Sequence, residues 1–537
     1  MMLLSQAAQV LNGKLIGPDV RFAAVSTDSR KIKTGDLFIA LRGEHFDGYE
    51  FVAQAAQKGA VAALVNADSH EAHSPVLSPD ETTGETTSHL TSPAKDAGLV
   101  IGYSHSTSPA KDAGQVAGYQ HSVLLVDDTR LALGQLAAYW RKQFGIPLVA
   151  ITGSNGKTTV KEMLAGILRV AAGSNDAVLT THGNLNNDIG MPLTLLQLNA
   201  QHRYAVIEMG MNHPGEIDYL TRIACPDVAL ITNASGAHLA GLGTVEAVAH
   251  AKGEIFAGFK PQGAAVINAD DDYAPLWRSL AGTHPLLEFG LGQPADVSGQ
   301  WQPQDAGLRL DAQTPSGDFS ADLQVPGAHN ARNALAATAA AIALNVPLEV
   351  IVRGLEEFGG VAGRLQRKAA RHGAVLIDDT YNANPASMRA AIEVLAQSAV
   401  EKPAGKRVFV MGDMGELGDN AAALHAEIGT AARSAGIEKL YALGALSVNA
   451  VRAFGCGAEY FERIEDLHKA LEDELDADAT VLVKGSRFMK MERVVQFCVD
   501  GVKEEPTKVQ GASEKGSCAL PPPSILPLPP SRKGEAQ

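Results

Sequence analysis

The residues from 147 to 159, PLVAITGSNGKTT, combine types and spacing that suit the binding of a phosphorylated ligand, with ATP as the expected one. Gly153 and Gly156 allow backbone N–H groups to turn toward phosphate oxygens. Lys157 supplies a positive charge, and Thr158 supplies a hydroxyl group for Mg²⁺. A glycine turn with a surface lysine is the alternative interpretation of the same letters.

A strand and a helix must position this loop. The apolar run before it predicts a strand, and VKEMLAGILRV after it predicts a helix whose positive dipole end faces the phosphates. The usual pattern has a glycine where this chain has Ile151, so the loop is a short variant of the motif. We expect the whole loop to contact ATP, through Thr152, Gly153, Ser154, Asn155, Gly156, Lys157, Thr158 and Thr159.

Glu208 ends the strand-like run AVIE, which places a carboxylate at the carboxyl edge of the predicted sheet. Mg²⁺ commonly takes only one or two protein carboxylates together with substrate phosphate, so Glu208 could share an ion with Thr158. A solvated or helix-capping glutamate is the alternative.

Two further residues have unusual surroundings. His238 follows the strand-like run VALITN and would reach the same sheet edge. Lys252 has apolar neighbours three and four positions away on its predicted helix, and buried lysines are uncommon. A structural histidine and a lysine that extends its amine to solvent are the alternatives.

Bulk properties restrict the class of protein. A chain of 537 residues predicts about three domains, and a net charge of −15 argues against nucleic acid and anionic membranes as partners. The longest apolar stretch is interrupted by polar residues and a proline, so we expect no membrane insertion. Four widely spaced cysteines and a start without a basic leader favour a cytoplasmic protein.

Alternating strand-like and helical runs predict an α/β protein. We expect an N-terminal domain at 1–145, a central nucleotide domain at 146–345, a C-terminal α/β domain at 346–502 and a disordered proline-rich tail at 503–537. Residues 69–122 contain the tandem repeat TSPAKDAGLVIGYSHS and TSPAKDAGQVAGYQHS, which we interpret as a solvated insertion in a surface loop.

These motifs together resemble the Mur ligase family, the ATP-dependent amide-forming enzymes of peptidoglycan precursor synthesis. The resemblance is carried by TGSNGKTT, THGNLNN, EMGMNHPGEI, AHL, AKGEI, HNARNALAA, GR and DDTYNANPAS, and it runs from about Val25 to Val495. It implies three α/β domains: a central P-loop ATPase domain with a parallel sheet, an N-terminal domain that binds a UDP-sugar, and a Rossmann-like C-terminal domain.

The resemblance also implies residue roles. Lys157, Glu208, His238, Lys252 and Arg364 would be catalytic. Thr158 and Glu208 would hold one Mg²⁺, and His238 with a carbamylated Lys252 a second. Besides the loop, ATP would contact Asn330, Asn333, Arg364 and Asp379. The substrates would contact Thr27, Asp28, Ser29, Arg30, Asn184, Leu185, Asn186, Asn187, Tyr381, Asn382 and Asn384, and residues 484–487 would complete the closing surface.

Within the family, DDTYNANPAS and MGDMGELG with His425 are most similar to ligases that join D-alanyl-D-alanine to UDP-N-acetylmuramoyl-tripeptide, and no DNPR motif occurs. The resemblance implies these two substrates, an acyl phosphate intermediate and a monomeric cytoplasmic enzyme. A ligase that adds the third amino acid, a folylpolyglutamate synthase-like ligase and a non-enzymatic nucleotide-gated binding protein remain as alternatives.

Overall fold

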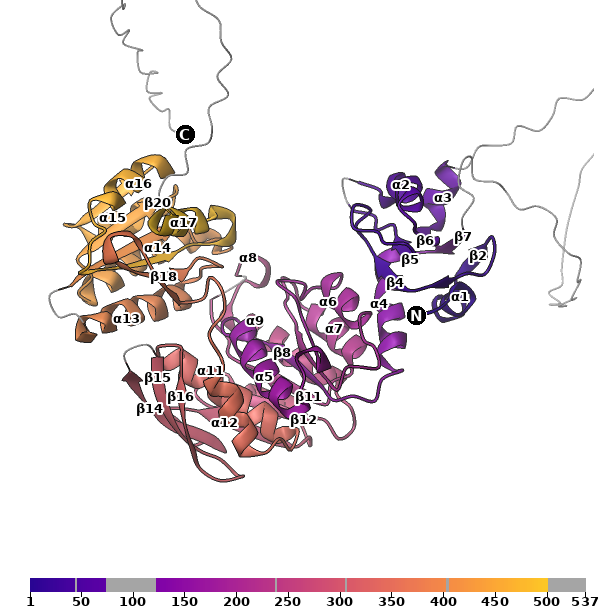
Figure 1. The fold of residues 1–537 in the computed structure, drawn as a ribbon, viewed down its shortest axis with the longest axis horizontal. Helices are drawn as coiled ribbons and strands as arrows, with labels where there is room; N and C mark the ends of the chain where they lie inside the picture. The colour runs from indigo at the N-terminus through magenta and orange to yellow at the C-terminus, as the bar shows by residue number, and fades with distance from the viewer. Residues whose placement is uncertain (44–45, 74–121, 237–238, 305–306, 402–404, 501–537) are drawn as a thin grey trace, which may run out of the picture.

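A computed structural model describes residues 1–43, 46–73, 122–236, 239–304, 307–401 and 405–500. Three large sheets, each with its own helices, form three domains that follow one another along an arc, with the central domain at its base (Figure 1). The expectations for the tandem repeat, for the proline-rich tail and for His238 fall outside the described residues.

The N-terminal domain is built on a five-stranded sheet in the order β2-β7-β6-β5-β4, in which only β2 is antiparallel to its neighbour. The elements are β1 (Met2–Leu3), α1 (Leu4–Leu11), β2 (Lys14–Ile16), β3 (Arg21–Phe22), β4 (Ala24–Ser26), β5 (Asp36–Ile39), α2 (Val52–Gln57), β6 (Ala62–Asn66), α3 (Ala67–His73), β7 (Ser122–Val126) and α4 (Thr129–Arg141).

The central domain has a nine-stranded sheet in the order β16-β15-β14-β13-β12-β11-β8-β10-β9. Its strands are β8 (Leu148–Thr152), β9 (Val178–Thr180), β10 (Tyr204–Glu208), β11 (Val228–Ile231), β12 (Ala264–Asn268), β13 (Leu286–Gly290), β14 (Val297–Gln304), β15 (Gly307–Gln313) and β16 (Phe319–Leu323). Its helices are α5 (Lys157–Ala172), α6 (Gly190–Leu195), α7 (Glu216–Ala224), α8 (Leu239–Leu242), α9 (Val245–Gly253), α10 (Ala274–Ala281), α11 (Ala328–Ala343) and α12 (Leu348–Glu356).

The expected parallel sheet is present from β9 to β14, but β14, β15 and β16 continue it as an antiparallel meander. The parallel sheet expected from the sequence is therefore confirmed, and the antiparallel meander at its edge is an addition that the sequence did not predict. Residues of β15 alternate between buried and exposed positions, as they do in an antiparallel strand with one face on the core.

The phosphate-loop strand β8 is apolar throughout because both faces of the sheet are covered. Leu148 and Ala150 pack with α4, α6 and α7, in a core that continues into the N-terminal domain. Val149 and Ile151 face the other side, against α5, α11 and α12. Because both faces of β8 are buried, the strand is held in a fixed orientation, and so is the start of the loop that follows it.

The C-terminal domain has a six-stranded sheet in the order β17-β18-β22-β19-β20-β21, with only β17 antiparallel. Its elements are β17 (Gln366–Ala369), β18 (Val375–Asp379), α13 (Pro385–Glu401), β19 (Lys406–Gly412), α14 (Ala421–Ser434), β20 (Lys439–Leu443), α15 (Val448–Phe454), β21 (Ala458–Phe461), α16 (Ile464–Glu472), β22 (Ala479–Lys484) and α17 (Glu492–Asp500).

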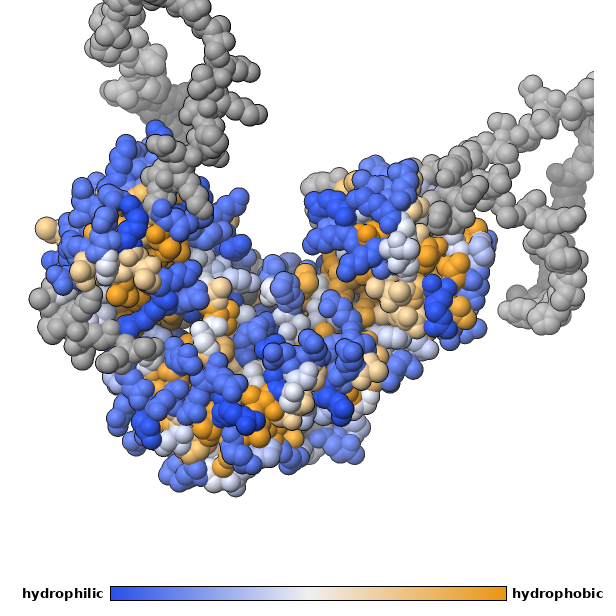
Figure 2. Space-filling view, viewed as in Figure 1, coloured by the Kyte–Doolittle hydropathy of each residue, from blue (hydrophilic) through white to orange (hydrophobic). Residues whose placement is uncertain are grey.

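Helix α12 packs Ile351 and Leu355 into the core of the central domain, although a boundary at residues 345 and 346 would assign it to the C-terminal domain. The visible surfaces of both outer domains mix hydrophilic and hydrophobic residues, and a hollow separates them above the central domain (Figure 2). None of the helices in the described ranges is long and apolar enough to cross a membrane.

Candidate functional site

The phosphate loop connects β8 to α5, and its two glycines are required by its shape. Gly153 and Gly156 have φ angles of 151° and 82°, which side chains with a Cβ atom rarely adopt. A Cβ atom on Gly156 would lie 2.5 Å from Asn333 Oδ1, and one on Gly153 would collide with the Thr232 hydroxyl. The loop is therefore close-packed against the residues that follow β11 and against α11.

Lys157 folds back over this loop. Its Nζ donates to the backbone carbonyl oxygens of Gly153 at 2.6 Å and of Ser154 at 3.3 Å. The backbone N–H groups of a loop of this type are the groups that bind phosphate. Burial lowers the pKa of Lys157; the Glu208 carboxylate opposes this shift and the Arg364 guanidinium adds to it. A bound polyphosphate would stabilise the charged amine.

Thr158 lies at the centre of a short polar chain. Its hydroxyl donates to Glu208 Oε2 at 2.8 Å and accepts from Arg364 Nη2 at 2.9 Å. The other carboxylate oxygen, Glu208 Oε1, accepts from Asn186 Nδ2 at 2.8 Å. Strand β10 supplies Glu208, helix α5 supplies Thr158, and Arg364 comes from the segment that leads into the C-terminal domain.

This donor set fits Mg²⁺. A hydroxyl and a carboxylate that already lie in hydrogen-bond contact are the hard oxygen ligands that Mg²⁺ prefers, and phosphate oxygens would supply the others. Within the described residues, no group of three or more His, Cys, Asp or Glu side chains gathers into a self-sufficient metal site. An ion here would therefore depend on a phosphate ligand.

Lys252 lies on α9 with 2% of its surface exposed. Within the described ranges its amine makes no hydrogen bond or ion pair. Burial lowers the pKa of Lys252 well below its usual value, with a further contribution from the Lys157 charge that the Asp271 carboxylate partly opposes. The structure thus excludes the solvent-directed alternative for this lysine.

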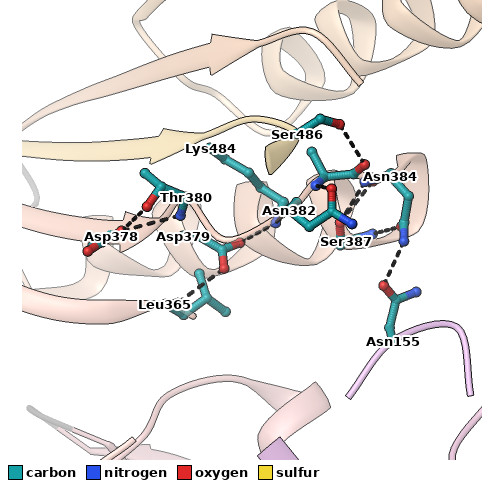
Figure 3. A network of polar contacts seen from close by, with 11 residues as sticks. Asn155, Leu365, Asp378, Asp379, Thr380, Asn382, Asn384, Ser387, Lys484 and Ser486 are labelled. Carbon is teal, nitrogen blue, oxygen red and sulfur yellow. Dashed lines mark hydrogen bonds and ion pairs between the residues drawn. The ribbon is translucent and has the colours of Figure 1, made fainter. Parts of the chain in front are cut away.

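The C-terminal domain approaches the loop through the segment after β18. Asn384 Nδ2 donates to Asn155 Oδ1 at 2.8 Å, and Figure 3 shows the Asn384 side chain directed at Asn155 across the boundary between the two domains. The guanidinium of Arg364 lies over the Tyr381 ring, 4.2 Å from its centroid. These contacts bring a second set of polar side chains to the phosphate loop.

Asp379, at the end of β18, accepts from Lys484 Nζ at 2.6 Å and from Leu365 N at 3.2 Å (Figure 3). Lys484 also donates to Asn382 O at 2.9 Å. Burial raises the pKa of Asp379, and the adjacent Lys484 ammonium opposes the shift. Asp379 therefore has a protein partner in the place where the family resemblance expects a ribose.

One cavity of about 1270 Å³ lies between the central and C-terminal domains. The sequence-predicted residues that line it are Ser154, Asn155, Gly156, Lys157, Thr158, Thr159, Asn184, Asn186, Asn187, Glu208, Asn330, Asn333, Arg364, Asp379, Tyr381, Asn382 and Asn384. The phosphate loop, the metal candidates Thr158 and Glu208, and the predicted dipeptide residues thus share one space.

Some predicted residues do not line this cavity. Thr152, Gly153, Leu185 and Lys252 are not among its lining residues. Thr152 and Lys252 are buried, whereas Leu185 is 38% exposed. The segment 27–30 lies in the N-terminal domain between β4 and β5, where Ser29 Oγ donates to Gln54 Oε1 at 2.7 Å. The structure does not bring this segment to the phosphate loop.

His329, at the start of α11 and within the HNARNALAA motif, also lines the cavity, although the sequence did not predict a role for it. Its Nε2 is buried and has no hydrogen-bond partner in the part of the chain that the structure describes. Burial lowers the pKa of His329 to about 4, and the charges of Arg332 and Lys484 add to the shift. His329 directly precedes Asn330, which was expected to contact ATP, and this position in the sequence could have identified it as a site residue.

Comparisons with known proteins agree with this architecture. Three family models match: "Mur ligase family, catalytic domain" at residues 21–141, "Mur ligase middle domain" at 151–341 and "Mur ligase, glutamate ligase domain" at 363–487. UDP-N-acetylmuramoyl-tripeptide–D-alanyl-D-alanine ligase of Escherichia coli K12 is 39% identical over 500 residues, which cover 92% of this chain and 97% of that protein. The Bacillus subtilis ligase of the same name is 33% identical, with 92% and 97% covered.

Among solved structures, crystal structure I of MurF from Acinetobacter baumannii has a TM-score of 0.76 and 36% identity, and the match covers 91% of this chain and 97% of that one. The three-domain α/β architecture expected from the sequence is therefore confirmed. From its family models, its full-length relatives and its fold, this chain belongs to the Mur ligase family.

Proposed function

We propose that this protein is an ATP-dependent ligase that joins D-alanyl-D-alanine to UDP-N-acetylmuramoyl-tripeptide through an acyl phosphate. The observation that carries the proposal is the convergence of Thr158, Glu208 and Arg364 at one end of a phosphate loop, in a chain that matches ligases of that name over more than nine-tenths of its length. The alternatives of a non-enzymatic binding protein and of a folate-extending ligase lack such support.

The chemistry follows from the charges that line the cavity. A peptide carboxylate attacks the γ-phosphorus of ATP, and the bond between that phosphorus and the ADP oxygen breaks. Lys157, which folds over the loop, and Arg364, which contacts Thr158, would neutralise the negative charge that moves from the attacking oxygen toward ADP. Mg²⁺, when bound at Thr158 and Glu208, would neutralise the phosphate oxygens as a Lewis acid.

The resulting acyl phosphate is a reactive electrophile. The amine of D-alanyl-D-alanine attacks its carbonyl carbon, loses a proton, and releases inorganic phosphate as the amide forms. Asn382 and Asn384 lie on the C-terminal side of the cavity and are the residues that we propose for holding the dipeptide. The segment 27–30 is proposed to hold the UDP end, which requires the N-terminal domain to approach the cavity on binding.

Lys252 is proposed to act as a carbamate. A lowered pKa leaves its amine neutral, so its lone pair can attack CO₂ and a proton is released. The product would be an anion at a place where Lys157 already supplies positive charge. Lys161 is equally buried and serves as a comparison for Lys252. Its amine donates to Thr181 O at 2.6 Å and pairs with the Glu162 carboxylate at 2.8 Å, so these partners stabilise it as a cation.

A phosphate-release assay with the UDP-linked tripeptide, ATP and Mg²⁺ tests the proposal against a panel of amines. We expect release that depends on D-alanyl-D-alanine. Release with the UDP-linked dipeptide and diaminopimelate, lysine or glutamate, but none with D-alanyl-D-alanine, would show another ligase of the family. A cytoplasmic location and a monomeric state remain predictions.

A further inference from the structure

The segment 413–416, between β19 and α14, contributes residues of the C-terminal domain to the wall of the cavity that holds the phosphate loop. Gly415 and Glu416 line the cavity. Glu416 has a φ angle of 61°, a conformation that residues other than glycine seldom adopt and that persists only when neighbouring contacts hold it. The segment belongs to the MGDMGELG motif, to which the phosphoryl-transfer chemistry assigns no role.

His425 on α14 holds this segment from behind. The imidazole is fully buried, its Nδ1 lies 2.6 Å from Ala421 O, and its Nε2 accepts from Met414 N at 2.9 Å. A carbonyl oxygen can only accept, so Nδ1 carries the proton and Nε2 keeps the lone pair that binds the Met414 N–H. Both ring nitrogens are therefore committed to backbone groups.

The segment is also tied to the residues that face the phosphate loop. Gly415 N donates to Ser486 Oγ at 2.8 Å, and Ser486 Oγ donates to Ala383 O at 3.3 Å. Ala383 lies between Asn382 and Asn384, and Asn384 contacts Asn155 of the phosphate loop. Hydrogen bonds and short backbone links thus connect His425 through Ser486 to the boundary between the two domains.

The aromatic ring of Phe488 stands beside the same segment. It is 62% exposed and lines the cavity, and a Cβ atom built on Gly415 would lie 3.0 Å from its Cε1. Phe488 and Gly415 thus give an apolar surface to a wall that otherwise presents Asn382, Asn384 and Glu416. A dipeptide with two methyl groups and two charged ends fits a wall with apolar and polar parts.

We propose that His425 is a positioning residue for the binding of the incoming amine, because it fixes the 413–416 segment and, through Ser486, the 382–384 segment. This inference rests on the proposed ligase function. Loss of the Nε2 acceptor leaves the Met414 N–H buried without a partner. It therefore loosens the 413–416 and 382–384 segments, which belong to the C-terminal domain. Lys157, Thr158 and Glu208 belong to the central domain and keep the contacts that they make within it.

The test compares His425→Leu, which removes both ring contacts, with His425→Gln, whose amide oxygen can still accept from Met414 N. Ser486→Ala cuts the connection to Ala383 with little change of volume. His468→Leu is the matched control, because His468 lies in the same domain but stacks on Phe497 away from the cavity.

Two reactions are measured for each variant. The first is the steady-state KM for D-alanyl-D-alanine and for ATP. The second is the trapping of the acyl phosphate by hydroxylamine in the absence of dipeptide, in which the amine nitrogen of hydroxylamine attacks the acyl carbon and phosphate leaves. The second reaction needs a folded enzyme and an intact phosphate site, but it does not need the 413–416 and 382–384 segments to bind a dipeptide.

For His425→Leu and Ser486→Ala we expect the KM for D-alanyl-D-alanine to rise about tenfold or more, since an unpaired buried N–H or a lost hydrogen bond is worth roughly that factor. The KM for ATP and the trapping rate should stay near the wild-type values, and His425→Gln should recover most of the loss. An unchanged KM for the dipeptide in both variants, or equal loss of trapping, would overturn the inference. If wild-type enzyme traps hydroxylamine but does not use D-alanyl-D-alanine, the proposed function fails instead.

Discussion

Replacement of Arg364 by alanine probes the contact that joins the C-terminal domain to the phosphate loop. Arg364 Nη2 donates to Thr158 Oγ1 at 2.9 Å over a sequence separation of 206 residues, and its guanidinium lies 4.2 Å above the Tyr381 ring. A hydrogen bond from a charged donor contributes about 1.5 to 3 kcal/mol. The stacking contact contributes about 0.5 to 2 kcal/mol, mainly to the position of the guanidinium.

If only the hydrogen-bond contribution is present in the transition state, kcat should fall about 10- to 150-fold, since each 1.36 kcal/mol is a factor of ten. Arg364→Lys keeps the charge but loses the planar fork and the stacking, so an intermediate loss is expected. Tyr381→Phe keeps the ring under the guanidinium and therefore the stacking contact, so any loss in this variant reports on the tyrosine hydroxyl group alone.

The assay is phosphate release under saturating substrates, followed by hydroxylamine trapping to isolate the first step. Both steps should slow in Arg364→Ala, because the same guanidinium faces both the γ-phosphate transfer and the departing phosphate. A kcat within threefold of wild type, in a variant with an unchanged melting temperature, would refute the assigned role. Loss confined to the KM for the UDP-linked substrate would also contradict it.

Further predictions concern the loop, the buried lysine and the buried histidine. Gly156→Ala should lose ATP affinity in a nucleotide-binding titration, because its Cβ atom would lie 2.5 Å from Asn333 Oδ1. Gly173→Ala is the control, since Gly173 also has a positive φ but its Cβ atom would meet nothing within 4 Å. This control should lose only about 1 kcal/mol of stability and should bind ATP normally. Lys252→Ala should abolish turnover, with partial recovery when short carboxylic acids replace the carbamate; full activity without them would exclude the carbamate. Burial lowers the pKa of His329 to about 4 in the folded protein, below its ordinary value of 6.5. Between these pH values the unfolded chain binds a proton that the folded chain does not. The free energy of unfolding should therefore fall as the pH drops from 6.5 to 4, by at most about 3 kcal/mol. Urea unfolding at pH 7 and pH 5 should show a smaller decrease in His329→Gln than in wild type; equal decreases would contradict the assignment.

Much of the fold could be predicted from local patterns. Apolar runs such as AVIEMG and TVLVKGS correspond to β10 and β22, and the helix after the phosphate loop begins at Lys157. The meander of β14 to β16 was not predicted, because alternating polar and apolar residues identify a half-buried strand but not the sheet edge that it joins. Helix α12 was placed in the next domain for a similar reason, since an amphipathic pattern does not say which core it covers.

The sequence by itself determined the phosphate loop and its immediate chemistry, because Gly153, Gly156, Lys157 and Thr158 are neighbours in the chain and their roles depend on local backbone geometry. Only the tertiary structure decided that Arg364 meets Thr158, that Lys252 is buried and that His425 supports the cavity wall. Contacts between residues tens to hundreds of positions apart depend on how whole domains pack, and the pKa of a buried group depends on the charges that this packing brings near.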